Sequence, residues 1–378
     1  MSAVKTHVRT NFERMRQTVA LASPDCQSGA PSLRCPRLET AMTATLRDVA
    51  DAAAVHPATA SRALNPETAH LVNSVTAKRV REAATRLGYT PNPLARSLKT
   101  NRTHSLGAVV PDITNPLFPP ILRGIEDIAE AAGFNVLIAN TDNEAAREHS
   151  QVASLRARQV DGLILASARL DDPVVSSLVA DSVPIVLVNR AEPDLPVSSV
   201  VGDDATGIRQ LVQHLVGLGH RRIAHISGPL TTSTGVVRLR AFRQEVAEAG
   251  LDPAACPTIA AEGYHVDEGG RCLTELLDTN PEITAVVAAN DLLAVGCYDA
   301  LKARGLSCPT DLSVVGFNDM PFVDRVAPPL TTVRVHLYDT GAEAARQLLA
   351  LLGDRTLPAR SVVLPVTLVV RGSTAPPR

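Results

Sequence analysis

The chain has 378 residues, which is long enough for two or three domains. Its hydrophobic share of 45% argues against a mostly disordered chain, and the absence of Trp means that small aliphatic side chains must fill the core. No apolar run is long enough to span a bilayer, and the stretch from Thr18 to Ala22 is too short for a secretory signal. We therefore expect a cytoplasmic protein without a membrane partner, whose six cysteines form no CxxC pair and stay reduced.

The formal net charge of −2 is distributed unevenly along the chain. Residues 42–104 hold nine Lys and Arg against four Asp and Glu, whereas residues 105–378 hold twenty-two against thirty-two. A basic N-terminal part followed by an acidic body indicates a polyanionic partner at one end. Chance scatter of surface charge would give the same asymmetry, so charge alone leaves both interpretations open.

Residues 1–42 show no steady hydrophobic period, and Ser, Pro, Gly and Cys cluster between Ser23 and Pro36. We expect a disordered extension, or a start codon assigned upstream of Met42.

Three helices are predicted within residues 43–90. The first follows the cap Thr45, and the second runs from about Pro57 to Leu64. The third begins after the cap Asn73 and is closed by Gly88. Two short helices joined by a tight turn form a helix-turn-helix unit, although an ordinary helical hairpin would show the same pattern. Residues 91–104 follow as a hinge with one short helical candidate that reaches about Lys99.

From Ser105 onward, apolar runs alternate with amphipathic segments. Buried parallel strands are predicted at 106–110, 135–139, 162–166, 185–188, 223–226, 285–288 and 312–315. Examples of the intervening helices are 122–132, 207–218, 237–249 and 292–304. This alternation predicts a doubly wound α/β fold that is long enough for two similar subdomains.

Catalytic signatures are missing from the sequence. No GxGxxG, GxxxxGK[ST], GxSxG or HExxH spacing occurs, and His214 and His220 fit a helix and its exit loop better than a metal site. We therefore expect no enzyme activity, no cofactor and no metal. A solute-binding protein that feeds a transporter would need a signal peptide and no basic head, and a sugar-modifying enzyme would need a catalytic constellation.

The stretch 45–105 begins TLRDVADAAAVHPATASRALN and ends RLGYTPNPLARSLKTNRTHS. The core continues with VVPDITNPLF, QVDGLIL, HLVGLGHRRIAHISGP, RLRAF, AANDLLAVG, DLSVVGFND, PPLTTV and LPVTLVVR. In these motifs the chain resembles the LacI/GalR family of repressors from residue 43 to residue 372. Two positions depart from the family pattern: His56 stands where the second helix usually has a Ser or Thr cap, and Ala54 stands where the turn often has Gly.

The resemblance implies a fold with three parts. A three-helix head at 43–90 and a hinge at 91–104 precede a periplasmic-binding-protein-like core at 105–372. The core would consist of two Rossmann-like subdomains, about 105–202 with 337–363 and about 203–333 with 364–372. Three crossovers would join them, near 200–205, 330–336 and 362–366.

The resemblance also implies a homodimer that binds double-stranded operator DNA. Arg62 could pair with guanine and Ala58 could touch a thymine methyl group, while two copies of Leu98 would wedge into the minor groove. A plain linker whose Leu98 packs on its own core is the alternative. The full set of candidate DNA-binding residues is Thr45, Pro57, Ala58, Thr59, Ser61, Arg62, Asn65, Arg96, Leu98 and Lys99.

In such proteins a small effector bound between the two subdomains controls affinity for the operator. The polar mixture implied for this cleft suits a sugar or sugar derivative, with a nucleobase as the alternative. Arg238 is the strongest candidate, because a guanidinium can span hydroxyls or meet an anion, although each position could instead be a helix cap or a loop residue. The candidate effector-binding residues are Asn115, Phe118, Asn189, Arg238, Asn290, Asp291 and Asn318, and Arg190 belongs to the same pattern.

Overall fold

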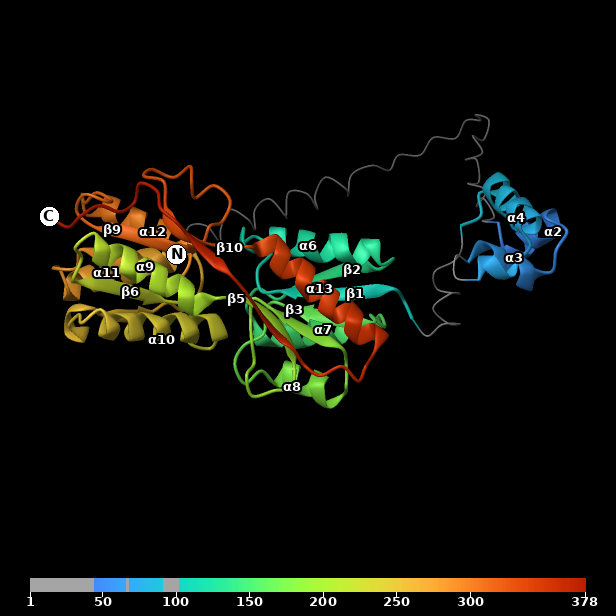
Figure 1. Cartoon of the computed structure of the whole chain (residues 1–378), viewed down its shortest axis with the longest axis horizontal. Helices are drawn as coiled ribbons and strands as arrows, with labels where there is room; N and C mark the ends of the chain where they lie inside the picture. The colour runs from blue at the N-terminus through green and yellow to red at the C-terminus, as the bar shows by residue number, and fades with distance from the viewer. Residues whose placement is uncertain (1–43, 66–67, 91–101) are drawn as a thin grey trace, which may run out of the picture. The chain divides into compact units, whose positions relative to one another are not determined.

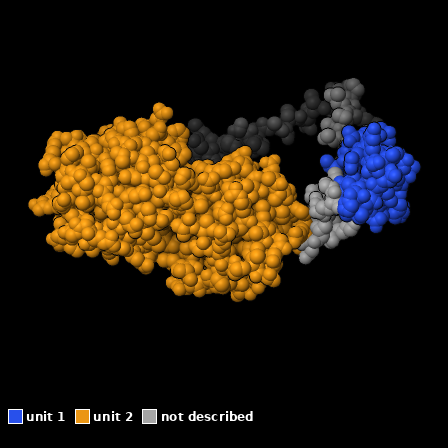
Figure 2. Space-filling model, viewed as in Figure 1, with its two compact units in different colours: residues 1–91 blue, residues 92–378 orange. Residues whose placement is uncertain are grey.

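The computed structural model describes residues 44–65, 68–90 and 102–378. The chain forms two compact units, 1–91 and 92–378 (Figure 2). The predicted extension and most of the predicted hinge, including Arg96, Leu98 and Lys99, lie outside the described residues.

The first unit contains the three helices predicted from the sequence. They are α2 (Leu46–Ala52), α3 (Pro57–Leu64) and α4 (Ser74–Leu87), with a 3₁₀ turn at Ala69–Leu71. Small side chains form most of their common core, so the helices can approach closely. The buried residues are Val49, Ala50, Ala53, Ala60, Ala63, Ala77, Val80, Ala83 and Ala84.

Side-chain caps fix where these helices begin. Thr45 and Asp48 form a capping box at the start of α2, and Asn73 accepts a hydrogen bond from the N–H of Val75 at the start of α4. His56 takes over the cap of α3, because its Nδ1 accepts a hydrogen bond from the N–H of Ala58 at 3.2 Å. The predicted change at the entry of this helix is therefore a substituted cap, and the helix itself is retained.

The second unit contains two six-stranded sheets (Figure 1). The first sheet is parallel throughout, and its strand order is β11 (Ser361–Leu364), β5 (Ser198–Gly202), β4 (Ile185–Val188), β3 (Gly162–Leu165), β1 (Ser105–Val110) and β2 (Asn135–Asn140). The second has the order β12 (Val366–Val369), β10 (Thr331–Val335), β9 (Ser313–Asn318), β8 (Ala285–Ala288), β6 (Ile223–Ser227) and β7 (Thr258–Ala260), and only β12 is antiparallel to its neighbour. These two sheets confirm the predicted α/β class.

Helices accompany both sheets. The first subdomain has α6 (Phe118–Ala131), which packs against α13 (Leu337–Gly353), and α7 (Ala145–Ala157), which packs against α8 (Pro173–Ala180). In the second, α9 (Asp204–Gly217) packs against α10 (Ser233–Glu248), and α11 (Val266–Thr279) packs against α12 (Asp291–Ala303), with a 3₁₀ turn at Pro253–Ala255. Among the described helices, none is long and apolar enough to cross a membrane.

The chain passes between the two subdomains three times. It crosses from β5 to α9, from β10 to α13, and from β11 to β12, at residues 202–204, 335–337 and 364–366. The chain also continues past the predicted end of the core at residue 372, because Val314 donates a backbone hydrogen bond to the carbonyl of Ser373.

Two helices begin four residues earlier than the sequence pattern indicated. α6 begins at Phe118, with Pro119 and Pro120 in its first turn, where a missing N–H costs no intrahelical bond. α10 begins at Ser233 after the cap Thr232, so Arg238 lies inside this helix and not before it.

Candidate functional site

The candidate DNA-contacting surface lies on α3. Ala58 and Arg62 are exposed on one face of this helix, while Ala60 and Ala63 are buried against α2 and α4. The side chains of Pro57, Thr59, Ser61 and Asn65 are half-buried. Arg62 is therefore the candidate base-reading residue with a long, accessible side chain.

Thr45, at the start of α2, is exposed, but its hydroxyl group already takes part in the capping box. It donates to the Asp48 carboxylate at 2.8 Å and accepts from the N–H of Asp48 at 3.3 Å. Any contact of Thr45 with a phosphate would have to share that hydroxyl group.

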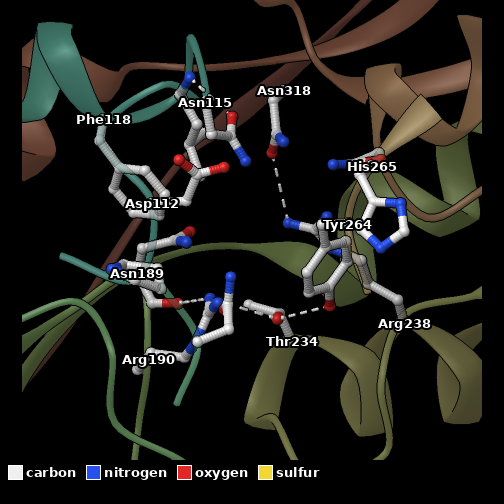
Figure 3. A pocket seen from close by; sticks show the side chains of 14 residues that line it. Asp112, Asn115, Phe118, Asn189, Arg190, Thr234, Arg238, Tyr264, His265 and Asn318 are labelled. Atoms are coloured by element: carbon white, nitrogen blue, oxygen red, sulfur yellow. Dashed lines mark hydrogen bonds between the residues drawn. The ribbon is translucent and has the colours of Figure 1, made fainter. Parts of the chain in front are cut away.

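The second unit contains a polar pocket at the carboxyl ends of the parallel strands (Figure 3). The space between its lining atoms, including the opening to solvent, is about 530 Å³. Both subdomains contribute, as expected for a doubly wound fold that binds a ligand at its strand ends. The lining residues are Pro111, Asp112, Asn115, Leu117, Phe118, Asn143, Asn189, Arg190, Thr234, Arg238, Tyr264, His265, Asn290 and Asn318.

Six of the seven predicted effector residues lie in this lining: Asn115, Phe118, Asn189, Arg238, Asn290 and Asn318. The predicted set did not include Asp112, Asn143, Thr234, Tyr264 and His265. Tyr264 and His265 follow the short edge strand β7, and the end of that strand is the signal that could have identified them.

Asp291 lies behind the lining and is fully buried. Its carboxylate accepts hydrogen bonds from the N–H of Met320 at 2.7 Å and from Thr332 Oγ1 at 2.6 Å. Burial raises the pKa of Asp291 to about 7, although both hydrogen bonds act in the opposite direction. The residue thereby fixes the loop that follows Asn318.

A second carboxylate also holds this loop. Asn318 and Asp319 both have positive φ angles, 114° and 53°, which are costly for residues other than glycine. The carboxylate of Asp319 accepts hydrogen bonds from Arg334 at 2.7 Å and from Arg371 at 2.6 Å. These two ion pairs hold the backbone in the conformation that directs Asn318 into the pocket.

Arg238 is only 3% exposed, and protein groups satisfy most of its guanidinium group. It forms an ion pair with Asp204 at 2.7 Å and lies 3.8 Å above the centre of the Phe317 ring. It also donates to the carbonyl of Ala289 and, at 3.5 Å, to Asn318 Oδ1. Its charge is thus balanced before any ligand binds.

Arg190 has different surroundings, although it is only 6% exposed. It donates to the carbonyl of Asn189 at 2.7 Å and to Thr234 Oγ1 at 3.4 Å, and its Nε has no hydrogen-bond partner. Burial lowers the pKa of Arg190, and the neighbouring Arg238 cation adds to this effect. Among the described residues, no carboxylate pairs with Arg190 within 4.0 Å.

Hydrogen bonds from backbone N–H groups also connect the two subdomains near this site. The N–H of Leu170 donates to the carbonyl of Thr231 at 2.8 Å, and the N–H of Ala191 donates to Ser233 Oγ at 3.0 Å. Both acceptors precede or begin α10, so the first turn of this helix is held against the first subdomain.

Within the described part of the chain, no group of three or more His, Cys, Asp and Glu residues could hold a metal ion. The pocket instead offers amides, hydroxyl groups and guanidinium groups, which suit recognition of a polar organic molecule by hydrogen bonds.

Comparison with known families gives two matches. Residues 45–92 match "Bacterial regulatory proteins, lacI family", and residues 212–374 match "Periplasmic binding protein-like domain". The first match covers α2, α3 and α4, and the second covers most of the second subdomain.

Individual relatives match over almost their whole length. The transcriptional regulator DegA of Bacillus subtilis is 35% identical over 89% of this chain and 99% of its own, and the ribose operon repressor of Halalkalibacterium halodurans is 33% identical over 87% and 97%. The solved lac repressor dimer bound to operator and the anti-inducer ONPF is 28% identical, with a TM-score of 0.79 over 88% of this chain and 99% of its own. The solved complex of the regulator CelR with cellobiose is 32% identical, with a TM-score of 0.67 over 87% and 99%.

These matches extend over the helix-turn-helix unit and over the two-sheet core with its pocket, and they agree with the resemblance in the sequence motifs. The chain belongs to the lacI family of bacterial regulatory proteins, which are DNA-binding transcriptional regulators.

Proposed function

We propose that this regulator is a homodimeric repressor whose affinity for operator DNA is set by a small polar effector in the pocket between the two core subdomains. The observation that carries the proposal is the pocket itself, because it brings six predicted effector residues from both subdomains around one cavity. A ligand held by both subdomains favours one of their arrangements over another, which is what regulation by a ligand requires.

On the DNA side, Arg62 and Ala58 are proposed to read base edges from α3, and the half-buried residues of the same helix are proposed to position it. The hinge at 91–104, with Arg96, Leu98 and Lys99, is proposed to contact the minor groove and the phosphates. A two-fold operator requires two heads, and one similar solved structure is that of a lac repressor dimer bound to its operator.

On the effector side, the amides of Asn115, Asn189, Asn290 and Asn318 suit ring hydroxyl groups, and Phe118 provides an apolar wall. The named ligands of similar proteins support a sugar, since one matched structure contains cellobiose and another contains ribose. A nucleobase remains the alternative, because it would also use an aromatic wall. Asp291 is proposed to act through the loop that it holds, without touching the effector.

The same proposal leaves no role for catalysis. The relatives are named as regulators, and the pocket has no nucleophile paired with a base. We further propose that the protein acts in the cytoplasm, where its operators are.

The test is a gel-shift titration of the full chain on the DNA upstream of its own operon and on random DNA of equal length. The wild-type protein should prefer the upstream DNA. Arg62→Ala should weaken the specific complex by about 1–3 kcal/mol and leave the random complex nearly unchanged. Arg222→Ala is the matched control, because Arg222 is an exposed residue of the core paired with Glu282.

A protein that binds both DNAs with equal affinity is not a sequence-specific repressor. If Arg62→Ala weakens both complexes equally, Arg62 contacts only phosphate.

A further inference from the structure

Arg190 carries a buried positive charge that the described residues do not neutralise. Its guanidinium group donates to a carbonyl group and a hydroxyl group and lies 5.9 Å from the centre of the Tyr264 ring, but no carboxylate pairs with it, and its Nε has no hydrogen-bond partner. Leaving a buried charged donor without a partner costs more than leaving an exposed one, so a ligand that supplies an acceptor there gains binding energy.

The other arginine of the pocket provides an internal comparison. Arg238 is as deeply buried and its Nε also lacks a hydrogen-bond partner, yet Asp204 lies 2.7 Å from its Nη2. Where the protein stabilises a buried guanidinium group by itself, it uses a carboxylate. Arg190 lines the same pocket without a paired carboxylate, and Asp204 and Glu148 act on its charge only at longer range. An anionic ligand would supply the close counter-ion that is missing.

The backbone around the pocket also contributes positive charge. Phe118 and Thr234 lie in the first turns of α6 and α10, and His265 and Asn290 occupy the cap positions of α11 and α12. The N-terminus of a helix carries a partial positive charge, and four such ends converge on this pocket. They add to the field of Arg190 and favour a negatively charged group.

One carboxylate in the lining limits where such a group can lie. Asp112 Oδ1 accepts from the N–H and the hydroxyl group of Thr114. In Figure 3, Asp112 lies beside Asn115, and Asn189 separates it from Arg190. The Asp112 end of the pocket therefore suits hydroxyl groups, while the Arg190 end suits an acceptor with negative charge.

From this charge pattern we propose that the effector is an anionic sugar derivative whose carboxylate or phosphate group binds Arg190. This rests on the proposed function for the location of the effector and adds its chemical class. A planar guanidinium group matches either anion through two parallel hydrogen bonds, and both hydrogen bonds of Arg190 to described residues use Nη1 alone.

The first experiment uses simple anions. The full-length protein and Arg190→Gln are melted while inorganic phosphate or acetate replaces chloride at constant ionic strength. The wild-type protein should show a saturable rise in Tm that Arg190→Gln lacks. The anion that gives the larger rise, phosphate or acetate, indicates whether the effector carries a phosphate or a carboxylate group. Arg222→Gln should behave as the wild type. If both anions raise the Tm of wild type and Arg190→Gln equally, the proposal is overturned, whether or not any sugar binds.

The second experiment compares matched ligands: glucose, glucuronate and glucose 6-phosphate, and then ribose with ribose 5-phosphate. At least one anionic member should bind wild type ten times more tightly than its neutral partner, which corresponds to about 1.4 kcal/mol. Arg190→Gln should reduce that preference to less than about threefold, and Arg190→Lys, which keeps the charge without the planar fork, should lie between the two. Neutral sugars that bind as tightly as their anionic partners would contradict the proposal.

A gel shift separates this proposal from the proposed function. An anion that binds through Arg190 without changing the affinity for operator DNA would leave the anion site intact and refute control by an effector. If a neutral sugar alone controlled DNA binding, control by an effector would stand and the anion site would be refuted.

Discussion

At the scale of a residue, the two arginines of the pocket, Arg190 and Arg238, differ in whether the protein itself neutralises their charge. Arg238 is part of the structure of the core, because its ion pair with Asp204 is buried and its guanidinium group packs over Phe317. Arg190 has no carboxylate partner among the described residues, and its proposed role is to bind the ligand. A substitution at Arg238 therefore cannot test ligand binding alone.

We predict that Arg238→Ala destabilises the core by about 3–5 kcal/mol, because it leaves the buried Asp204 carboxylate without its partner. Arg222→Ala, which breaks an exposed pair with Glu282, should cost less than about 1 kcal/mol. Urea unfolding of both variants measures the difference. The double variant Arg238→Ala, Asp204→Ala should be more stable than Arg238→Ala alone. If it is less stable, Asp204 does not depend on Arg238.

Sequence motifs located half of the lining when Arg190 is counted, because most of these candidates follow a strand that could be recognised by its apolar residues. They could not separate Asp291 from Asn290, its neighbour in the chain. The backbone directs one side chain to the pocket and the other to Met320 and Thr332, which are distant in sequence. The pairing of Arg238 with Asp204 could not be predicted either, because the two residues lie on different helices and are 34 residues apart in the sequence.

At the scale of the element, local sequence was sufficient to predict most helices and strands. The helices of the head and the buried strands carry their own signals, namely caps, periodicity and short apolar runs. The starts of α6 and α10 were placed too late, because their first turns contain prolines or polar residues and lack the apolar period. The ion pairs of Asp319 with Arg334 and Arg371 had no local signal at all, because they join three separate strands or strand ends.

The turn between α2 and α3 has one strained position. Ala54 has a φ angle of 51°, in the left-handed region that costs a residue with a Cβ atom about 1–2 kcal/mol. Ala54→Gly should relieve this strain, for a net gain of about 0.5–1 kcal/mol after the greater unfolded-state entropy of glycine. Hydrogen exchange of the α3 amides in the full-length protein should become slower. The control Ala52→Gly, inside α2, should make exchange faster, and the same sign for both variants would argue against strain at Ala54.

Two histidines hold the C-terminal segment against the second sheet. His220 Nε2 donates to the carbonyl of Ala375 at 2.9 Å, and the other ring nitrogen lies 2.8 Å from Thr284 Oγ1. His214 Nε2 lies 3.0 Å from Thr374 Oγ1. Burial lowers the pKa of both imidazoles below the ordinary value of 6.5.

A histidine whose pKa is lower in the folded state stabilises that state fully above pH 6.5, and the stabilisation is lost as the pH falls through the folded value. We therefore predict that this segment is held firmly at pH 7.5 and loosens progressively as the pH falls below 6.5. The amide of Val314, which donates to Ser373, should lose protection from hydrogen exchange after correction for the intrinsic rate. His220→Gln should remove most of this pH dependence, whereas His149→Gln, on the exposed face of α7, should not.

At the scale of the whole second unit, three crossing segments join the two subdomains, and residues of both line the pocket. Ser233 links the two subdomains in the arrangement of this structure, because its hydroxyl group accepts the N–H of Ala191 across the boundary between them. The start of α10 does not depend on Ser233, since Thr232 is the cap and accepts the N–H of Gly235. Removing the Ser233 hydroxyl group should thus affect closure without affecting the helix.

We predict that Ser233→Ala shifts the ligand-free core toward the open arrangement. One hydrogen bond contributes about 0.5–1.5 kcal/mol, so affinity for the effector found by screening should fall by about 2–13-fold. Small-angle scattering of the ligand-free protein should show a larger radius of gyration, and saturating effector should restore the wild-type value. Ser154→Ala, on the exposed face of α7, is the control and should change neither quantity. An unchanged affinity for Ser233→Ala would mean that the bond to Ala191 does not contribute to closure, and that the effector alone holds the two subdomains together.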